Sequence, residues 1–406
     1  MMVASPCINI CRLDADNVCV GCWRSIEEIS RWNRFDDTER LRALAAAEIR
    51  QRVSQLRIVS FLPSATEMAC ALGLEESIVG ISHECDFPPR IREKPVVVHS
   101  AIPVKSMSLG EIDVAVSAQL KNGNSLYEVD VDLLRELRPT HILTQDLCQV
   151  CAPAGNEVTR ALNALPNAPE ILWMSPHSIA DIHNDLRNLA RITGRERLAN
   201  ELIARDVARL DSVHERVKDA AIRRAFCAEW IDPIYCCGHW VPEQLEIAGG
   251  FDPLGRKWKD SVRVSIDDVI SADPEIIIVM PCGFGLEGAT QQAFEFASKY
   301  SRLGAVKNGR VYAVDASYFS RPSLRVIDGT ELLAHILHPN RFEWRGPKKA
   351  YARIKTCAEC GAGFTCGSDS SGFNCWCEEL PPLPRDAITS NGCLCRACLK
   401  QKVSVK

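Results

Sequence analysis

The sequence has no long hydrophobic run, few aromatic residues and almost no net charge. The chain has 406 residues, of which 6% are aromatic, and its formal net charge at pH 7 is −4. Its longest apolar stretches, such as residues 276–280, fall far short of the roughly 18 to 20 residues that a membrane span needs. We therefore expect no membrane span, and the near balance of charge gives no reason to expect a nucleic acid as partner.

The first residues also lack an export signal. The segment MMVASPCINICRLDADN has no basic stretch followed by an apolar stretch of about 7 to 15 residues, which is the pattern of a secretory signal peptide. We therefore expect a cytoplasmic protein. A content of 46% hydrophobic and 25% charged residues excludes wholesale disorder, and the length predicts two or three folding units.

Cysteine is abundant, and its 20 residues fall into three groups. Four lie between Cys7 and Cys22, eight are scattered over residues 70–282, and eight crowd into residues 357–398. In a reducing cytosol such crowding favours metal ligation over disulfides. Both ends of the chain are therefore expected to bind metal.

The two terminal groups differ in what their spacing indicates. The N-terminal group is Cys7-x3-Cys11-x7-Cys19-x2-Cys22, which supplies enough thiolates for one zinc ion or one iron-sulfur cluster, and the spacing does not choose between them. The C-terminal group begins and ends with a C-x-x-C pair, which is typical of a zinc ribbon and predicts one or two zinc sites. The C-terminal candidate ligands are Cys357, Cys360, Cys366, Cys375, Cys377, Cys393, Cys395 and Cys398.

Between the termini, short apolar or β-branched runs alternate with helical segments. The predicted strands are residues 57–61, 77–81, 141–144, 170–174, 225–230, 275–280 and 310–314. Strands that alternate with helices indicate βα units and parallel sheets, so we predict an α/β protein with two lobes. Residues 178–222 keep a helical apolar stripe broken mainly at Gly194, which predicts one long or once-bent helix between the lobes.

These patterns divide the chain into six parts. They are an N-terminal Cys-rich module with helices (1–55), lobe one (56–177), a bridging helix (178–222), lobe two (223–340), a polar basic linker (341–356) and a C-terminal Cys-rich, zinc-ribbon-like module (357–400).

Several motifs in residues 56–340 carry a family resemblance. They are RIVSFLPSATEMACALGL, GISHECDFPP, LLRELRPTHILTQ, VSIDDVISADPEIIIV and SYFSRPSLRVIDG. This region resembles the iron-siderophore and cobalamin class of ABC-transporter substrate-binding proteins, and most of all its cobalamin-binding branch. The resemblance implies two Rossmann-like lobes joined by a single long helix, with cobalamin or a related corrinoid as ligand.

The flanking segments resemble two small families. SPCINICRLD with CVGCWRSIEEISRW is similar to a short bacterial family of predicted iron-sulfur or metal proteins, and CAEC, CWC and CLCRACL are similar to the cysteine-rich CWC family. Both resemblances imply metal binding. They also leave room for a protein partner that contacts the terminal modules.

Ligands of open parallel sheets bind at the carboxyl ends of the strands, so the segments after predicted strands hold the candidate ligand-binding residues. These residues are His83, Glu84, Cys85, Asp86, Cys148, Cys151, Trp230, Cys237, His239, Trp240, Cys282, Tyr318, Phe319 and Arg321. The aromatic side chains would supply flat apolar faces for a corrin-sized ring, and a histidine or a cysteine thiolate would approach its metal. The alternative is that the cysteines and aromatic residues are ordinary core. A redox role for the Cys148-x-x-Cys151 pair is a further alternative.

Three functions follow from these features. The first is a cytoplasmic binding protein for cobalamin or a related metal chelate. The second is an enzyme that uses the cysteine and histidine residues on a small substrate or cofactor, although no recognised catalytic motif supports it. The third is a scaffold or regulator that works through its Cys-rich metal modules. We assign no catalytic residue.

Overall fold

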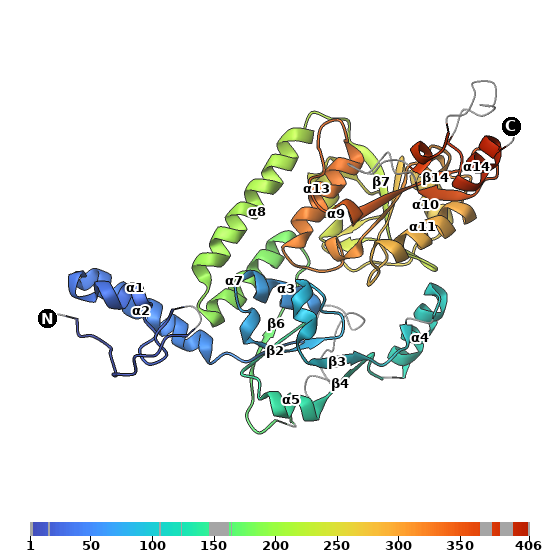
Figure 1. The fold of residues 1–406 in the computed structure, drawn as a ribbon. Helices are drawn as coiled ribbons and strands as arrows, with labels where there is room; N and C mark the ends of the chain where they lie inside the picture. The colour runs from blue at the N-terminus through green and yellow to red at the C-terminus, as the bar shows by residue number, and fades with distance from the viewer. Residues whose placement is uncertain are drawn as a thin grey trace. The chain divides into compact units, whose positions relative to one another are not determined.

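The structure is a computed structural model, and it describes residues 3–14, 17–104, 107–122, 124–145, 162–163, 165–365, 376–381 and 393–404. The chain divides into two compact units (Figure 1). Unit 1 takes its described residues from 1–101, 125–174 and 184–201, and unit 2 takes them from 102–124, 175–183 and 202–406. Each unit contains a sheet built around a set of parallel strands, with helices, which confirms the predicted α/β fold.

Unit 1 is built on a six-stranded sheet with the order β4-β3-β2-β1-β5-β6. The strands are β1 (Ile58–Ser60), β2 (Ile78–Ser82), β3 (Val96–Ser100), β4 (Tyr127–Val129), β5 (His141–Thr144) and β6 (Glu170–Trp173). All neighbours pair in parallel except β3 and β4, which are antiparallel. The carboxyl ends of β1, β2, β3, β5 and β6 therefore share one edge of the sheet.

Unit 1 contains the helices α1 (Ile26–Arg31), α2 (Asp37–Ser54), α3 (Pro63–Ala71) and α5 (Val131–Leu137), with short 3-10 turns at Trp32–Arg34, Glu75–Ser77 and Pro89–Glu93. Side-chain caps begin three of them, α1, α2 and α5, and α3 begins with a proline in its first turn. Capping boxes, Ser25 with Glu28 and Asp36 with Glu39, satisfy free backbone N–H groups at the starts of α1 and α2. Arg50 of α2 donates to both oxygens of Glu28, so the two N-terminal helices are fixed to each other.

Unit 2 contains a seven-stranded sheet with the order β10-β7-β12-β13-β14-β15, and β8 pairs with β7. The strands are β7 (Arg223–Ile231), β8 (Ile234–Cys236), β10 (Gly250–Phe251), β12 (Ile276–Val279), β13 (Val311–Val314), β14 (Tyr351–Thr356) and β15 (Gly363–Thr365). A separate two-stranded ladder joins β9 (Gly238–His239) to β11 (Arg256–Lys257). The first four strands of the main sheet run parallel, and β14, β15 and β8 are antiparallel to their neighbours.

Unit 2 contains the helices α4 (Leu109–Lys121), α9 (Val241–Ile247), α10 (Ile266–Ala272), α11 (Leu286–Lys299), α12 (Gly304–Lys307), α13 (Arg325–Leu337) and α14 (Arg396–Ser404), with 3-10 turns at Ala316–Tyr318, Lys348–Ala350 and Trp376–Glu379. Four of these helices, α4, α10, α11 and α12, contribute side chains to an apolar core that also contains residues of β7, β12 and β13. Phe226, Ile277 and Phe296 are each at most 1% exposed in this core.

The segment expected to form one bridging helix is instead two helices, α7 (Ile179–Thr193) and α8 (Glu196–Val217). The break lies at Gly194, whose φ of +70° suits glycine, and Arg195 N–H closes the turn on Ala190 O. Ile49 of α2 lies against this turn, because a Cβ on Gly194 would stand 3.2 Å from its Cγ2. The apolar stripe was thus predicted correctly, but the glycine ends one helix rather than bending a continuous one.

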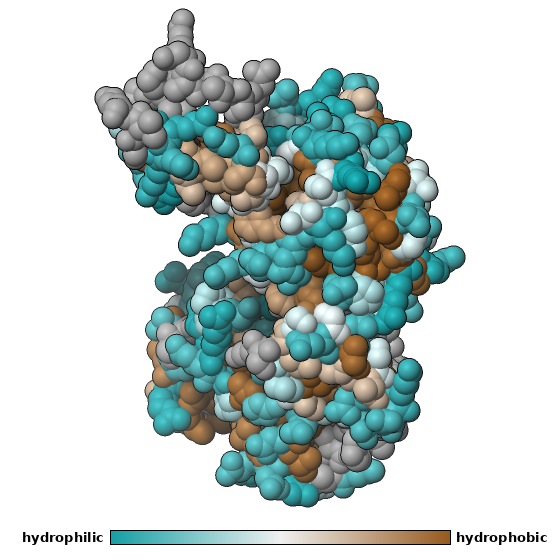
Figure 2. Space-filling view, turned by 90° about the vertical axis from the view of Figure 1, so that its right-hand side faces the viewer, coloured by the Kyte–Doolittle hydropathy of each residue, from teal (hydrophilic) through white to brown (hydrophobic). Residues whose placement is uncertain are grey.

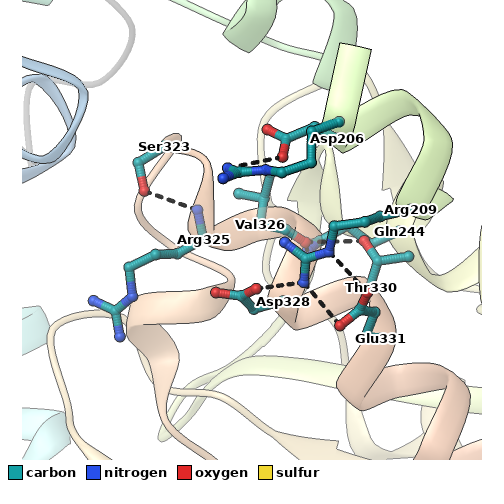
Figure 3. A network of polar contacts seen from close by, with 10 residues as sticks. Asp206, Arg209, Gln244, Ser323, Arg325, Val326, Asp328, Thr330 and Glu331 are labelled. Atoms are coloured by element: carbon teal, nitrogen blue, oxygen red, sulfur yellow. Dashed lines mark hydrogen bonds and ion pairs between the residues drawn. The ribbon is translucent and has the colours of Figure 1, made fainter. Parts of the chain in front are cut away.

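Within unit 2, α8 is joined to α13 by a network of polar contacts (Figure 3). Arg209 Nη2 donates to Asp328 Oδ1 at 2.6 Å and to Glu331 Oε2 at 2.8 Å. One turn earlier on α8, Asp206 is fully buried, and this burial raises its pKa to about 6.

Two segments lie outside the parts that the sequence assigned to them. Residues 102–124, which include α4, pack in unit 2, where Leu109 and Ile112 join the apolar core. Residues 341–356 are not a linker, because they contain β14, which pairs with β13 over four residues. The many basic residues of this segment made it resemble a linker in the sequence. In the structure its apolar side chains Phe342, Trp344 and Ile354 are buried.

The surface is mixed in character. Figure 2 shows one face of the molecule, on which hydrophilic residues predominate and hydrophobic residues gather in patches between them. Among the helices that the structure describes, none combines the length and the apolar character that crossing a membrane requires.

Candidate functional site

In unit 1, the candidate residues after β2 divide between surface and interior. His83 is exposed, and its ring lies 6.2 Å from that of Tyr127. Glu84 and Asp86 are half-buried, and Asp86 lies 3.7 Å from Arg92. Cys85 points inward instead, since it is 3% exposed and its Sγ lies 3.0 Å from Thr66 Oγ1. The segment therefore offers His83, Glu84 and Asp86 at the surface.

The candidate cysteines after β5 lie outside the described residues. The structure follows β5 as far as Gln145, which is buried at the carboxyl end of the strand. The positions of Cys148 and Cys151 are not among those it describes.

In unit 2, two aromatic rings meet at the carboxyl ends of neighbouring strands. Trp230 lies near the end of β7 and Phe284 follows β12, and these strands pair in parallel. Their ring centroids are 5.8 Å apart in an edge-on arrangement, and both side chains are half-buried. Trp230 Nε1 donates to Asp232 O, which holds the indole in place. Cys282, also half-buried, lies in the same turn as Phe284.

The other aromatic candidates are part of the interior of unit 2. Trp240 is 4% exposed, Tyr318 6% and Phe319 1%, and Trp240 Nε1 donates to Phe319 O at 2.8 Å. Arg325 lies over the Tyr318 ring, 4.7 Å from its centroid. Arg321, half-buried, follows this buried segment. These three rings are packed within the unit, as the core alternative requires.

Cys237 belongs to a buried group that the sequence did not reveal. Its Sγ donates to Asp252 Oδ2 at 3.6 Å, and the same carboxylate accepts the backbone N–H of Cys227 at 2.9 Å. Burial raises the pKa of Asp252 to about 6, and a side-chain hydrogen bond with Cys227, together with burial, raises the pKa of Cys237. The three residues are far apart in sequence, and no motif marks them as neighbours.

His239 is gathered with two residues that sequence reasoning missed. One ligand atom each from His177, His239 and Asp260 lie within 4.8 Å of one another. The three come from separate segments of unit 2, before α7, on β9 and after β11. A cluster of two imidazoles and a carboxylate has the chemistry of a transition-metal site.

The C-terminal cysteines form the predicted group in part. Cys357, Cys360, Cys395 and Cys398, the two C-x-x-C pairs, place their Sγ atoms within 4.8 Å of one another. Burial opposes ionisation of Cys357, but backbone N–H groups of Cys360, Cys395 and Glu359 donate to its sulfur and lower its pKa to about 6. The remaining C-terminal candidates are placed as follows: Cys377 and Cys393 lie outside this group, and Cys366 and Cys375 lie outside the described residues.

The N-terminal cysteines are not gathered in this way. Cys7 and Cys11 are exposed, whereas Cys19 and Cys22 are buried. Cys19 Sγ donates to Ile10 O at 3.0 Å, and Arg24 Nε donates to Cys22 Sγ at 3.5 Å. Among the described residues, no group of three or more ligands within 4.8 Å includes any of the four.

Comparison with known families covers most of the chain. The sequence profile of the family described as periplasmic binding protein matches residues 58–318. A second family, described as a protein of unknown function (DUF1289), matches residues 5–51. The first match spans both sheets up to β13 and its 3-10 turn, and it agrees with the resemblance found in the sequence motifs.

Individual relatives point the same way. A vitamin B12-binding protein of Vibrio cholerae is 24% identical over 276 residues, which cover 68% of this chain and 86% of that protein. An uncharacterised ABC transporter substrate-binding lipoprotein of Bacillus subtilis is 23% identical over 297 residues, covering 71% of this chain and 81% of the lipoprotein.

Solved structures share the fold. The periplasmic vitamin B12 binding protein of Vibrio cholerae superposes with a TM-score of 0.52 at 21% identity, covering 69% of this chain and 96% of that one. A periplasmic heme binding protein of the same organism gives a TM-score of 0.54 at 16% identity, covering 70% and 99%.

These comparisons correct the expected compartment. The matching family is described as periplasmic, and one relative is a substrate-binding lipoprotein of an ABC transporter, so the expectation of a cytoplasmic protein is wrong. That expectation rested on the first residues of the chain alone. The preference for metal over disulfides can no longer rest on a reducing cytosol, and it now depends on how the cysteines are arranged in space.

Proposed function

Since the chain belongs to the periplasmic binding protein family, we propose that it is a substrate-binding protein whose ligand is cobalamin or a related metal chelate. The named relatives and structural neighbours are binding proteins, which favours binding over catalysis. The cysteine and histidine residues then serve as contacts or as structural groups, not as nucleophiles.

The aromatic pair of Trp230 and Phe284 carries this proposal. Both rings lie at the carboxyl edge of the unit 2 sheet, where ligands of parallel α/β sheets bind, and both keep part of their surface accessible. A planar macrocycle gains free energy by covering such faces, because aromatic side chains bury a large apolar area and favour offset or edge contacts. Cys282, which is half-buried and lies in the same turn as Phe284, is the thiol that we propose for the metal of the ligand.

The test is equilibrium dialysis of the full chain with cyanocobalamin, hemin and a ferric siderophore. We expect micromolar affinity or better for at least one of them. Trp230→Ala and Phe284→Ala should each weaken that affinity by about tenfold or more, because each removes roughly 1.5 to 3 kcal/mol of buried apolar contact.

The matched control is Ile222→Ala. Ile222 is 70% exposed and lies just before β7, at the opposite end of the strand from Trp230, so its loss should leave the affinity unchanged. If the folded protein binds none of the three compounds at tens of micromolar, the proposed ligand class is wrong.

A second role is supported at the C-terminus, where we propose that Cys357, Cys360, Cys395 and Cys398 hold one zinc ion. Four thiolates around zinc at about 2.3 Å stand roughly 3.8 Å apart in a tetrahedral site. Cys360 Sγ and Cys395 Sγ are 3.7 Å apart, so this pair already has the spacing of two zinc ligands, and all four sulfurs lie within 4.8 Å of one another. A disulfide would need two sulfurs at about 2.05 Å, which is much shorter than the 3.7 Å between Cys360 Sγ and Cys395 Sγ.

Zinc content of the full chain tests this second role. Protein purified without chelator should contain zinc, and the double variant Cys360→Ser with Cys395→Ser should contain one equivalent less. Cys70→Ser is the control, because Cys70 lies on α3, in unit 1. Equal zinc in all three proteins would contradict the assignment. We also propose zinc or an iron-sulfur cluster at the N-terminal cysteines, which the same metal analysis would detect as additional zinc or as iron. A protein partner for the terminal modules is a separate proposal.

A further inference from the structure

We propose that His177, His239 and Asp260 form a binding site for a divalent transition-metal ion of the zinc type. This site is separate from the C-terminal cysteines, and it does not depend on the identity of the chelate proposed above. It takes the free ion, not a chelate, because three protein ligands converge on one point.

The distances fit a metal ion. One ligand atom from each residue lies within 4.8 Å of the other two, and His239 Nε2 is 3.2 Å from Asp260 Oδ1. Zinc binds imidazole nitrogen and carboxylate oxygen at about 2.0 to 2.2 Å, which places neighbouring ligands of a tetrahedral site roughly 3.3 to 3.5 Å apart. A small closing movement of the His177 ring would therefore complete the site.

The backbone holds His239 and Asp260 in this relation before any ion binds. His239 pairs with Lys257 in the β9–β11 ladder, its N–H donates to Lys259 O at 2.7 Å, and its carbonyl accepts from Trp258 N–H. Gly238 permits this close approach, because a Cβ there would stand 2.6 Å from the backbone nitrogen of Ser261. The segment that carries Asp260 is thus packed directly on the strand that carries His239.

The third ligand is brought in by Glu243 of α9. Glu243 Oε2 accepts the backbone N–H of Ile179, two residues after His177, at 3.1 Å. The same oxygen accepts Trp258 Nε1, two residues before Asp260, at 3.2 Å. One carboxylate therefore ties together the two segments that supply the outer ligands, and Glu243 is a positioning residue of the site.

The environment of the His239 side chain suits it to be a metal ligand. Its Nε2 is buried and makes no hydrogen bond of acceptable geometry with the described residues, although it faces Asp260. A buried polar atom without a hydrogen bond is costly, and a bound ion would remove that cost.

The ligand set indicates which ion binds. Two imidazoles and one carboxylate suit zinc, cobalt(II) or nickel, whereas calcium and magnesium prefer sites made of oxygen atoms. Three protein ligands leave a tetrahedral ion one open position, and Asp260 is 77% exposed, so water or a further ligand can reach it. This distinguishes the site from the closed set of four cysteines.

The experiment measures zinc binding by the full chain under reducing conditions, with stoichiometry taken by equilibrium dialysis. The wild-type protein should bind one equivalent more than His177→Ala or Asp260→Asn. Glu243→Gln should keep that equivalent but weaken it by about 10- to 100-fold, as loss of a residue that orients a ligand does. His214→Ala is the control, because His214 is exposed on α8 and belongs to none of the three ligand groups.

Cobalt(II) supplies a second readout that separates this site from the cysteines. Thiolate ligands give cobalt strong charge-transfer absorption in the near ultraviolet, and imidazole with carboxylate gives only weak visible bands. The weak bands should be lost in His177→Ala and Asp260→Asn, while the thiolate absorption stays. Circular dichroism would check that each variant is folded. Equal stoichiometry and equal cobalt spectra in the wild-type protein and in folded variants would overturn the proposal, whatever the outcome of the chelate-binding experiment.

Discussion

Arg263 Nη2 lies 2.7 Å from Asp113 Oδ2, and this ion pair fastens α4 beside the hairpin of β7 and β8. Arg263 Nε also donates to the hydroxyl of Tyr235 on β8 at 2.9 Å. Leu109 and Ile112, on the same helix as Asp113, are buried in the apolar core. The helix therefore covers apolar side chains near the end of the strand that carries the ligand-binding candidate Trp230.

We expect Arg263→Ala to loosen α4 without unfolding unit 2. The pair is partly exposed, so its loss should cost at most about 1 kcal/mol, but local opening of α4 should become more frequent. Hydrogen exchange of residues 109–121 should accelerate, while exchange of β12 should not. Arg197→Ala, which removes an exposed pair with Glu201 on α8, is the control. Unchanged exchange in α4 would show that the ion pair does not hold the helix.

Arg209→Ala should lower the stability of unit 2 more than a typical surface substitution. Asp328 and Glu331 stand one turn apart on α13, and without Arg209 their charges would repel each other in a half-buried setting. We expect a loss of about 1 to 3 kcal/mol, measured as a lower midpoint of urea unfolding.

Adding Asp328→Asn and Glu331→Gln to the Arg209 variant should recover much of this loss. Lys218→Ala, which breaks an exposed pair with Glu215 near the end of α8, should change the midpoint little. A triple variant no more stable than Arg209→Ala would refute charge repulsion as the cause.

Asp206 should make the fold less stable as the pH rises from about 4 to 6. Burial raises its folded-state pKa to about 6, above the ordinary value of 3.8, so the folded protein holds this proton more tightly than the unfolded chain. The stabilising effect of the bound proton is complete below pH 3.8 and is lost as the pH passes through the folded pKa. His183, Arg205, Arg209 and Asp328 are the titratable groups near it.

Asp206→Asn should therefore raise the melting temperature at pH 8 and change it much less at pH 4. The corresponding gain in the free energy of unfolding at pH 8 should be on the order of 3 kcal/mol. Asp211→Asn on the exposed side of α8 should show no such dependence. If Asp206→Asn raises the stability equally at both pH values, ionisation of the Asp206 carboxyl group is not the cause of the gain.

Removal of metal from the C-terminal cysteines should destabilise the neighbouring strand of the unit 2 sheet. Cys357 directly follows β14, and its N–H donates to Ala362 O in the turn that leads to β15. Chelation in the full chain should accelerate amide exchange of residues 351–356 and leave β7 protected. No change on chelation of zinc-loaded protein would show that the ion does not support these strands.

Much of the fold could be predicted from the sequence because strand cores are short apolar runs. The run at residues 141–144 matches β5, and the run at 275–280 contains β12. β14 was missed because Arg353 and Lys355 stand beside its buried residues, Tyr351 and Ile354, and make the segment resemble a linker. Here the pairing with β13 determines the structure, and composition does not reveal it.

The candidate sites were less predictable. An aromatic residue at or after the end of a strand looks the same in the sequence whether it is buried, as Trp240 is, or half-buried, as Trp230 is. The cysteine pairs at the C-terminus were found because their spacing is itself a signal. His177 and Asp260 carry no such signal, since only the folding of three distant segments brings them to His239.

The position of β14 bears on where the protein can be cut. The family profile ends at residue 318, and a truncation placed just after α13 would keep everything that the profile matches. It would also strip the partner strand from Val311–Val314, whose side chains are almost all buried. An apolar edge strand without its neighbour is a template for pairing with other molecules. Aggregation of such a shortened chain would then reflect an exposed sheet edge rather than instability of the lobe itself.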